Sequence, residues 1–341
     1  MAGVKPVRGR YLLLGLLGLA LGLAIPVLLG GRALGPVLVQ IRLWHLLALL
    51  GLIVLAWNLN AGRLRLLVGG IDGHRITQWQ ALGVVMASEF AISATPGGAG
   101  GPVTYAYLLR RHGLPVPQGL ALYTIDQLLD MLFFLMALLA FAAHELWLPH
   151  GSRLVWQILL LIGLLLAGAG VVIAIVRRYR RFVLFTGRVL RRLGIRSSTR
   201  HKLMRRVLEY RQGLLRIRHY SPWRLMAVYG LCAGHWLLRY SVLYFAVREV
   251  GGNVDWLYAF IVQMISLSVG HAILLPGGSG GAEASATLLL LSSLDPAQLA
   301  GAILIWRFVT FYWYLIAGAP VFFLLVGKNL WSRWRADELP S

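Results

Sequence analysis

The sequence is poor in acidic residues and has almost no cysteine. Its 341 residues include 12 Asp and Glu, 33 Lys and Arg, and one cysteine. The single cysteine, Cys232, excludes an internal disulfide and a Cys-x-x-Cys pair for metal binding or redox chemistry. Charged residues make up only 13% of the chain, whereas 58% is hydrophobic and the mean hydropathy is +0.72. This balance is outside that of soluble domains and predicts a membrane protein.

Long apolar runs recur along the chain. A helix of about 20 apolar residues crosses the roughly 30 Å of bilayer hydrocarbon, and six runs of that order occur at 11–31, 44–61, 118–143, 154–176, 223–246 and 297–326. A signal peptide is the alternative for the first run, but its apolar stretch is too long and no convincing small-residue cleavage site follows. We therefore expect an all-α polytopic membrane protein with about six full transmembrane helices.

The basic residues are concentrated in one block between two apolar runs. Fifteen Lys and Arg lie between Arg177 and Arg218, and the apolar residues among them recur at roughly helical spacing. This pattern predicts amphipathic helices lying on an anionic leaflet. No recognised nucleic-acid-binding motif accompanies the charge, so we expect no nucleic-acid partner.

The placement of basic residues also predicts the orientation. Of the 33 Lys and Arg, 26 fall on one side if the N-terminus, the 62–79 loop, Arg110 and Arg111, the basic block and the tail after Gly327 share that side. By the positive-inside rule this side is cytoplasmic. We expect a multi-pass protein of the bacterial cell inner membrane with both termini in the cytoplasm.

Two similar glycine-rich breaks interrupt apolar segments, one in each half of the chain. Proline cannot continue a helix, and glycine allows the backbone angles of a reversal. The breaks comprise Pro96, Gly97, Gly98, Gly100 and Gly101 in the first half, and Pro276, Gly277, Gly278, Gly280 and Gly281 in the second. We expect re-entrant hairpins at 80–113 and 256–294, so that the halves 1–176 and 223–341, joined by the basic segment 177–222, are inverted repeats.

The breaks predict a polar site within the membrane. Backbone groups freed by a broken helix need protein or water as partners, because hydrocarbon offers none. The helices that resume near Pro102 and Ala282 direct unpaired N–H groups toward the midplane, which suits an anion such as a lipid phosphate. The alternative is that the glycines only allow close helix packing.

A few ionisable residues lie deep in the apolar runs, where each is costly without a partner or a function. We expect Arg239 and Arg307 to be the counter-charges of Glu89 and Glu283. Asp126 and Asp130 share one helix face, so one of them holds a proton or pairs with an arginine. A second polar face carries His235 and Arg239. For each acid a purely structural role is the alternative, and no residue cluster suggests a metal or another cofactor.

These residues resemble the transmembrane region of lysylphosphatidylglycerol synthases, a flippase-like family, over nearly the whole chain. The resemblance rests on the segment 107–113 after the first break, on the helix with Asp126 and Asp130, and on the second break followed by 302–307. The family's Pro-Gly-Gly-x-Gly-x-x-Glu element is filled from Pro276 to Glu283. In the first half, Gln127 stands in place of a common arginine, and an acid and an arginine often seen after the first break are missing.

The resemblance implies a protein that binds or moves a phospholipid, glycolipid or polyprenyl-linked lipid. Under this interpretation both glycine loops, Glu283 and Arg307 contact the headgroup, while Glu89, Asp126, Asp130, His235 and Arg239 form a buried charge network. Only 14 residues follow Gly327, so we expect no soluble domain and no aminoacyl transfer. The alternatives are a membrane partner of a glycosyltransferase or other lipid-modifying enzyme, or such an enzyme itself.

Overall fold

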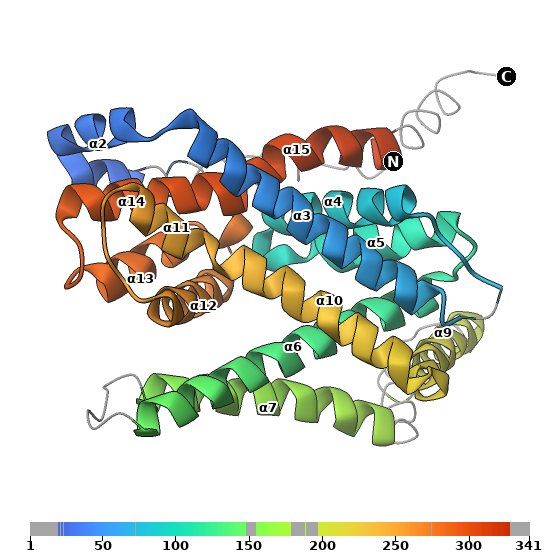
Figure 1. Cartoon of the computed structure of the whole chain (residues 1–341). Helices are drawn as coiled ribbons and strands as arrows, with labels where there is room; N and C mark the ends of the chain where they lie inside the picture. Colours follow the sequence, from blue (N-terminus) through green and yellow to red (C-terminus); the bar gives the residue numbers. More distant parts are fainter. Residues whose placement is uncertain are drawn as a thin grey trace, which may run out of the picture. The chain divides into compact units, whose positions relative to one another are not determined.

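The computed structural model describes residues 20, 22, 24–71, 73–147, 155–178, 188, 197–273 and 275–327, most of which lie in helices and none in a strand. Figure 1 shows the arrangement. The α-helices labelled there are α2 (Leu34–Gln40), α3 (Leu43–Val68), α4 (Gln78–Ala94), α5 (Gly100–Arg111), α6 (Val116–Trp147), α7 (Val155–Arg177), α9 (Ser197–Leu215), α10 (Pro222–Tyr240), α11 (Val242–Glu249), α12 (Trp256–Ala272), α13 (Gly281–Leu290), α14 (Pro296–Arg307) and α15 (Trp313–Phe322).

Six shorter helical turns connect or extend these helices. Four are 3₁₀ turns, namely η1 (Gly31–Ala33), η2 (Pro96–Gly98), η3 (Arg216–His219) and η4 (Pro276–Gly278). Two are π-helical turns, η5 (Phe308–Tyr312) and η6 (Phe323–Gly327), which continue α14 and α15 without a loop. Both predicted breaks therefore fold as 3₁₀ turns between two helices.

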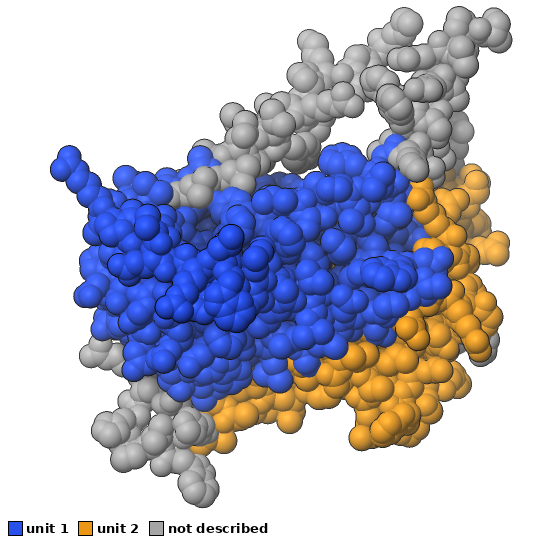
Figure 2. All heavy atoms as spheres, turned by 45° about the horizontal axis from the view of Figure 1, so that its top comes forward, with its two compact units in different colours: residues 1–62, 77–108, 234–341 blue, residues 63–76, 109–233 orange. Residues whose placement is uncertain are grey.

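The chain divides into two compact units that interleave along the sequence (Figure 2). Unit 1 comprises residues 1–62, 77–108 and 234–341, and unit 2 comprises 63–76 and 109–233. Within unit 1, α4 packs on α15, α11 on α14, α12 on α13, and η2 on η4. Within unit 2, α6 packs on both α7 and α9. Both glycine-rich breaks thus belong to unit 1.

Within the described residues, three helices are long and apolar enough to cross a membrane. These are Leu43–Val68, the Val116–Ala143 part of α6, and the continuous Pro296–Gly327 segment formed by α14, η5, α15 and η6. They correspond to the apolar runs at 44–61, 118–143 and 297–326. Residues 11–19, 21 and 23 of the first predicted run, and 179–187 and 189–196 of the basic block, fall outside the described residues.

Local capping explains where the helices next to the breaks begin. Thr77 starts α4, because its hydroxyl accepts from the Gln80 N–H at 3.2 Å while the Gln80 side chain accepts from the Thr77 N–H at 2.8 Å. Asp255 starts α12 by accepting from the Leu257 N–H at 3.1 Å. Each cap satisfies donors that the first turn of a helix leaves unpaired.

The predicted run at 223–246 is interrupted at Ser241. The helix α10 ends at Tyr240 and α11 begins at Val242. The side chain of Gln263, which is fully buried, donates to the Arg239 carbonyl at 3.1 Å and accepts from the Leu243 N–H at 3.3 Å. One amide side chain thus satisfies backbone groups on both sides of the interruption. Hydrocarbon could not, because it offers no hydrogen-bond partner.

Candidate functional site

The second break reverses the chain through three glycines with positive φ. Gly277, Gly278 and Gly280 have φ values of +60°, +64° and +84°, a region that other residues enter only with strain. Leu275 before the turn is extended, and α13 begins at Gly281 after it. The sequence predicted this reversal, although the new helix begins one residue before the expected Ala282.

A buried ion pair closes the second break. The Glu283 carboxylate accepts from the Gly280 N–H at 2.7 Å and lies 2.7 Å from Nε of Arg307. Arg307 also donates to the Gly277 carbonyl at 3.0 Å and to the Ser279 hydroxyl at 3.3 Å. The carboxylate therefore occupies the N–H end of α13, the position that favours an anion.

The second break is packed without spare space. Glu283 is 0% exposed and Arg307 is 1% exposed. A Cβ on Gly277 would lie 1.9 Å from Cε2 of Phe311, and one on Gly278 would lie 2.8 Å from the carbonyl carbon of Gly270. The Arg307 guanidinium lies over the Phe311 ring, 4.5 Å from its centre. Glycine is thus required for close approach as well as for backbone angle.

The glycine at residue 22 lies against the same polar group. A Cβ there would be 3.0 Å from Oε1 of Glu283, 3.0 Å from the Tyr312 hydroxyl and 3.8 Å from the Ser279 hydroxyl. The Tyr312 hydroxyl is buried and makes no hydrogen bond in the described part of the chain. Tyr312 lies in the π-helical turn that follows Arg307, and π-helical turns are frequent at functional sites. Sequence reasoning did not identify Tyr312.

The first break has the same 3₁₀ turn but a neutral closure, and only two of its glycines, Gly97 and Gly98, have positive φ. Gly97 has φ 60° and ψ 15°, the same values as Gly277. Here the Thr95 hydroxyl accepts from the Gly100 N–H at 2.8 Å and donates to the Ala91 carbonyl at 2.6 Å. The helix α5 begins at Gly100, earlier than the expected Pro102. The two turns η2 and η4 pack against each other, so both breaks meet within unit 1.

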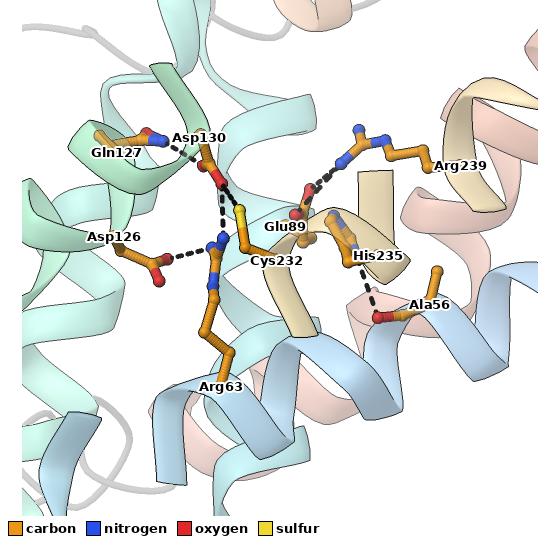
Figure 3. Close-up of polar contacts among 9 residues, drawn as sticks. All are labelled: Ala56, Arg63, Glu89, Asp126, Gln127, Asp130, Cys232, His235 and Arg239. Atoms are coloured by element: carbon orange, nitrogen blue, oxygen red, sulfur yellow. Dashed lines mark hydrogen bonds and ion pairs between the residues drawn. The ribbon is translucent and has the colours of Figure 1, made fainter. Parts of the chain in front are cut away.

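A second ion pair in unit 1 joins α4 to α10. Nη1 of Arg239 lies 3.3 Å from Oε1 of Glu89, as expected from the sequence (Figure 3). The guanidinium also lies over the Tyr314 ring, 4.8 Å from its centre. One turn earlier on α10, His235 is 2.9 Å from the Ala56 carbonyl through Nδ1. Glu89 thus has an arginine as its partner, and His235 has a backbone carbonyl.

In unit 2 the two aspartates of α6 share one arginine (Figure 3). Nη2 of Arg63 lies 2.7 Å from Oδ2 of Asp126, and Nη1 pairs with Oδ1 of Asp130. Asp130 also accepts from Gln127 at 2.9 Å and from the Cys232 thiol at 3.4 Å. Arg63 is only 1% exposed. The sequence predicted that one aspartate pairs with an arginine. In the structure, Arg63 pairs with both Asp126 and Asp130.

Arg63 was missed because the apolar run was expected to end at 61, which put this arginine in a cytoplasmic loop. The helix α3 instead continues to Val68, and the residues that follow Arg65 are apolar again. That second apolar stretch is the signal that could have extended the helix. The expected counter-charges of Glu89 and Glu283 are confirmed, whereas contact of any of these residues with a lipid remains a prediction.

Comparison with known proteins gives a match to the family model described as "Lysylphosphatidylglycerol synthase TM region" over residues 15–318. The chain belongs to this family. A relative, a UPF0104 membrane protein of Archaeoglobus fulgidus, is 25% identical over 270 residues, which cover 77% of this chain and 81% of the relative. The resemblance inferred from the sequence is therefore confirmed, and the chain is a membrane protein of the lysylphosphatidylglycerol synthase TM region family.

In this member of the lysylphosphatidylglycerol synthase TM region family, the second break is closed by an ion pair. The element from Pro276 to Glu283 places its acid against Arg307 on α14. The corresponding position beyond the first break has Val103, which is 66% exposed. The departure noted in the sequence thus corresponds to a different way of closing the turn.

Proposed function

We propose that this chain is a lipid carrier, a flippase or scramblase, that moves an amphipathic lipid with an anionic headgroup between leaflets. The observation that carries the proposal is the contact between two helix breaks with the same backbone turn, one from each half of the sequence. Broken helices that meet inside a bundle are a recurring way to build a substrate site at the midplane of a transporter.

The lengths of the helices support re-entrant hairpins. The helix α13 has 10 residues and α5 has 12, which at 1.5 Å per residue gives roughly 15 and 18 Å. Neither spans the roughly 30 Å hydrocarbon layer alone. In this proposal the segments 80–113 and 256–294 enter and return on one side, and six full spans with two inverted hairpins make up the membrane region.

Replacement of the Glu283 carboxylate by a lipid phosphate would couple headgroup binding to opening of the second break. In the closed arrangement the Glu283 carboxylate takes the α13 N–H group and the Arg307 guanidinium. A lipid phosphate offers the same kind of acceptor oxygens and binds arginine strongly. It would replace Glu283 on these donors, while its acyl chains stay in the bilayer. Return of Glu283 would then release the headgroup.

The same proposal includes an orientation. The halves 1–176 and 223–341 would be inverted repeats joined by the basic segment 177–222 at the cytoplasmic face. Both termini would lie in the cytoplasm, and the membrane would be the inner membrane of a bacterial cell. No chemical step is assigned to the chain, because the buried acids that are described are paired with arginines.

The test is transfer of fluorescent lipids across liposomes that contain the purified chain, with anionic, aminoacylated and polyprenyl-phosphate lipids compared. We expect transfer of at least one class, and its loss in Arg307→Ala and in the double variant Glu283→Gln/Arg307→Ala. Anionic lipid that co-purifies should fall in Arg307→Ala and rise in Glu283→Gln, since the competing carboxylate is gone.

Two outcomes would overturn the proposal. If lipid transfer persisted in the double variant, the second break would not contact the headgroup during transfer. Absence of transfer for every lipid class would favour a non-catalytic membrane partner of a glycosyltransferase or lipid-modifying enzyme, and turnover of a lipid-linked sugar by the purified chain would favour an enzyme.

A further inference from the structure

The helix α9 crosses α6 near the beginning of that membrane-length helix. A Cβ on Gly213 of α9 would lie 2.7 Å from Cβ of Ala121, and the Tyr210 hydroxyl lies 2.8 Å from the Thr124 hydroxyl. In Figure 1, α6 runs across the page whereas α9 is seen almost along its own axis. At 1.5 Å per residue, Ala121 is about 8 Å from the start of α6. If α6 spans a bilayer, α9 therefore lies along its surface.

The end of this segment is also fixed to unit 2. After α9 and η3, the Tyr220 hydroxyl donates to the Leu67 carbonyl at the end of α3, and its ring fills the space beside Gly70, where a Cβ would be 2.2 Å away. Burial raises the pKa of Tyr220 to about 12, so the hydroxyl keeps its proton and remains a donor. Anchors at both α6 and α3 hold α9 in place.

The exposed sides of α9 separate charge from apolar surface. Helical spacing puts Leu203, Met204, Val207 and Leu208 along one flank, which ends at Arg211, and Lys202, Arg205 and Arg206 along the other. Leu203 and Leu208 are 37% and 42% exposed. The Arg205 side chain is 84% exposed, although it makes an i,i+4 pair with Glu209 at 3.2 Å. An apolar flank next to a cationic flank is the pattern of a helix at a membrane surface.

We propose that α9 is an interfacial helix that binds anionic lipid of the membrane in which the chain is embedded. Leu203 and Leu208 enter the boundary between headgroups and acyl chains, and Lys202, Arg205 and Arg206 contact lipid phosphates. The occupant is an anionic lipid surface because this flank carries three exposed cations and one acid, Glu209. The inference needs α6 to span the membrane and does not depend on lipid transport.

The test uses the full-length chain in vesicles, with a fluorescent label on Leu208→Cys. Cys232 is buried, so the unmodified chain labelled in parallel serves as the blank. Brominated phosphatidylglycerol and brominated phosphatidylcholine are compared as quenchers at equal mole fraction. Each surface cation favours anionic lipid by about 5-fold, which corresponds to about 1 kcal/mol. We expect phosphatidylglycerol to be enriched at the label by about 5-fold or more.

Neutralising the helix should remove this preference. In Lys202→Gln/Arg205→Gln/Arg206→Gln the two quenchers should become equivalent, while Arg32→Gln/Arg42→Gln/Arg248→Gln, which loses the same charge elsewhere, should keep the preference. Salt of about 1 M, where the Debye length is about 3 Å, should weaken it in the unmodified chain. Equal quenching before neutralisation, a preference that survives it, or no quenching by either lipid would each overturn the inference.

Discussion

The two glycine-rich breaks share a backbone turn and differ in how they satisfy it. At the first break a single hydroxyl, that of Thr95, joins the helix before the turn to the helix after it. At the second, Glu283 and Arg307 bring a full negative and a full positive charge to the equivalent place, with no exposed surface on the acid. One break is closed by neutral contacts within its own segment, and the other by an ion pair to a distant helix.

This difference shows that a repeated sequence motif fixes a conformation and not a chemistry. A neutral hydrogen bond offers little that an incoming anion can replace. A carboxylate on a helix N-terminus and an arginine occupies donors that a phosphate also uses. The buried pair is costly to desolvate, and it stabilises the closed state only while both partners are present. Under the proposed function, we therefore expect a headgroup to act at the second break.

The largest effect is expected from removing the cation of the second break. Arg307→Ala leaves the Glu283 carboxylate buried without its counter-charge, which should destabilise the folded chain by about 3–5 kcal/mol. Thermal unfolding in detergent measures the loss. The control Arg205→Ala, which breaks an exposed i,i+4 pair, should cost no more than about 0.5 kcal/mol.

Adding a second change should distinguish a lost ion pair from a general packing defect. Glu283→Leu combined with Arg307→Ala removes the stranded charge, so the double variant should be more stable than Arg307→Ala alone. A double variant that is even less stable than the single one would show that packing, and not charge, dominates at this break.

A smaller effect is expected when one methyl group is added at equivalent glycines. Gly98 and Gly278 have similar φ values, +71° and +64°, so the backbone strain of an alanine should be similar. The nearest neighbour is a side-chain methyl group of Ile92 at 3.3 Å in the first case and the Gly270 backbone at 2.8 Å in the second. Gly278→Ala should therefore be less stable than Gly98→Ala by about 1–3 kcal/mol. Equal melting temperatures would contradict the tighter packing assigned to the second break.

The smallest effect is expected at the hydroxyl of the first break. Thr95→Val keeps the shape of the side chain but leaves the Gly100 N–H without its acceptor, at a cost of about 1 kcal/mol. Thr95→Ser retains the hydroxyl and should unfold close to the unmodified chain. If both variants lost stability equally, the methyl group and not the hydrogen bond would be holding the first turn.

Composition and pattern predicted the coarse fold well. The apolar runs at 44–61, 118–143 and 297–326 became membrane-length helices, and both Pro-Gly-Gly elements became turns between helices. The ion pairs of Glu89 and Glu283 were also anticipated, because a charge deep in an apolar run needs a partner and few candidates existed. These inferences depend on hydrophobicity and charge, which can be counted along a sequence.

The details that the sequence did not reveal depend on tertiary contacts. The extension of α3 past Arg63 is stable because two aspartates of α6 compensate that arginine. The interruption of the 223–246 run at Ser241 is bridged by Gln263, which is an unremarkable amide in the sequence. The contact between the two breaks likewise joins segments from opposite halves of the chain. Local periodicity carries no information on such pairings.

One transport measurement compares the roles of the two breaks directly. Fluorescent anionic lipid would be followed across liposomes containing the unmodified chain, Thr95→Val or Glu283→Gln, each checked for intact folding by size-exclusion chromatography. We expect Thr95→Val to transfer lipid at nearly the unmodified rate, whereas Glu283→Gln should lose transfer and retain more bound anionic lipid. Equal transfer by the two variants would contradict the assignment of headgroup handling to the second break.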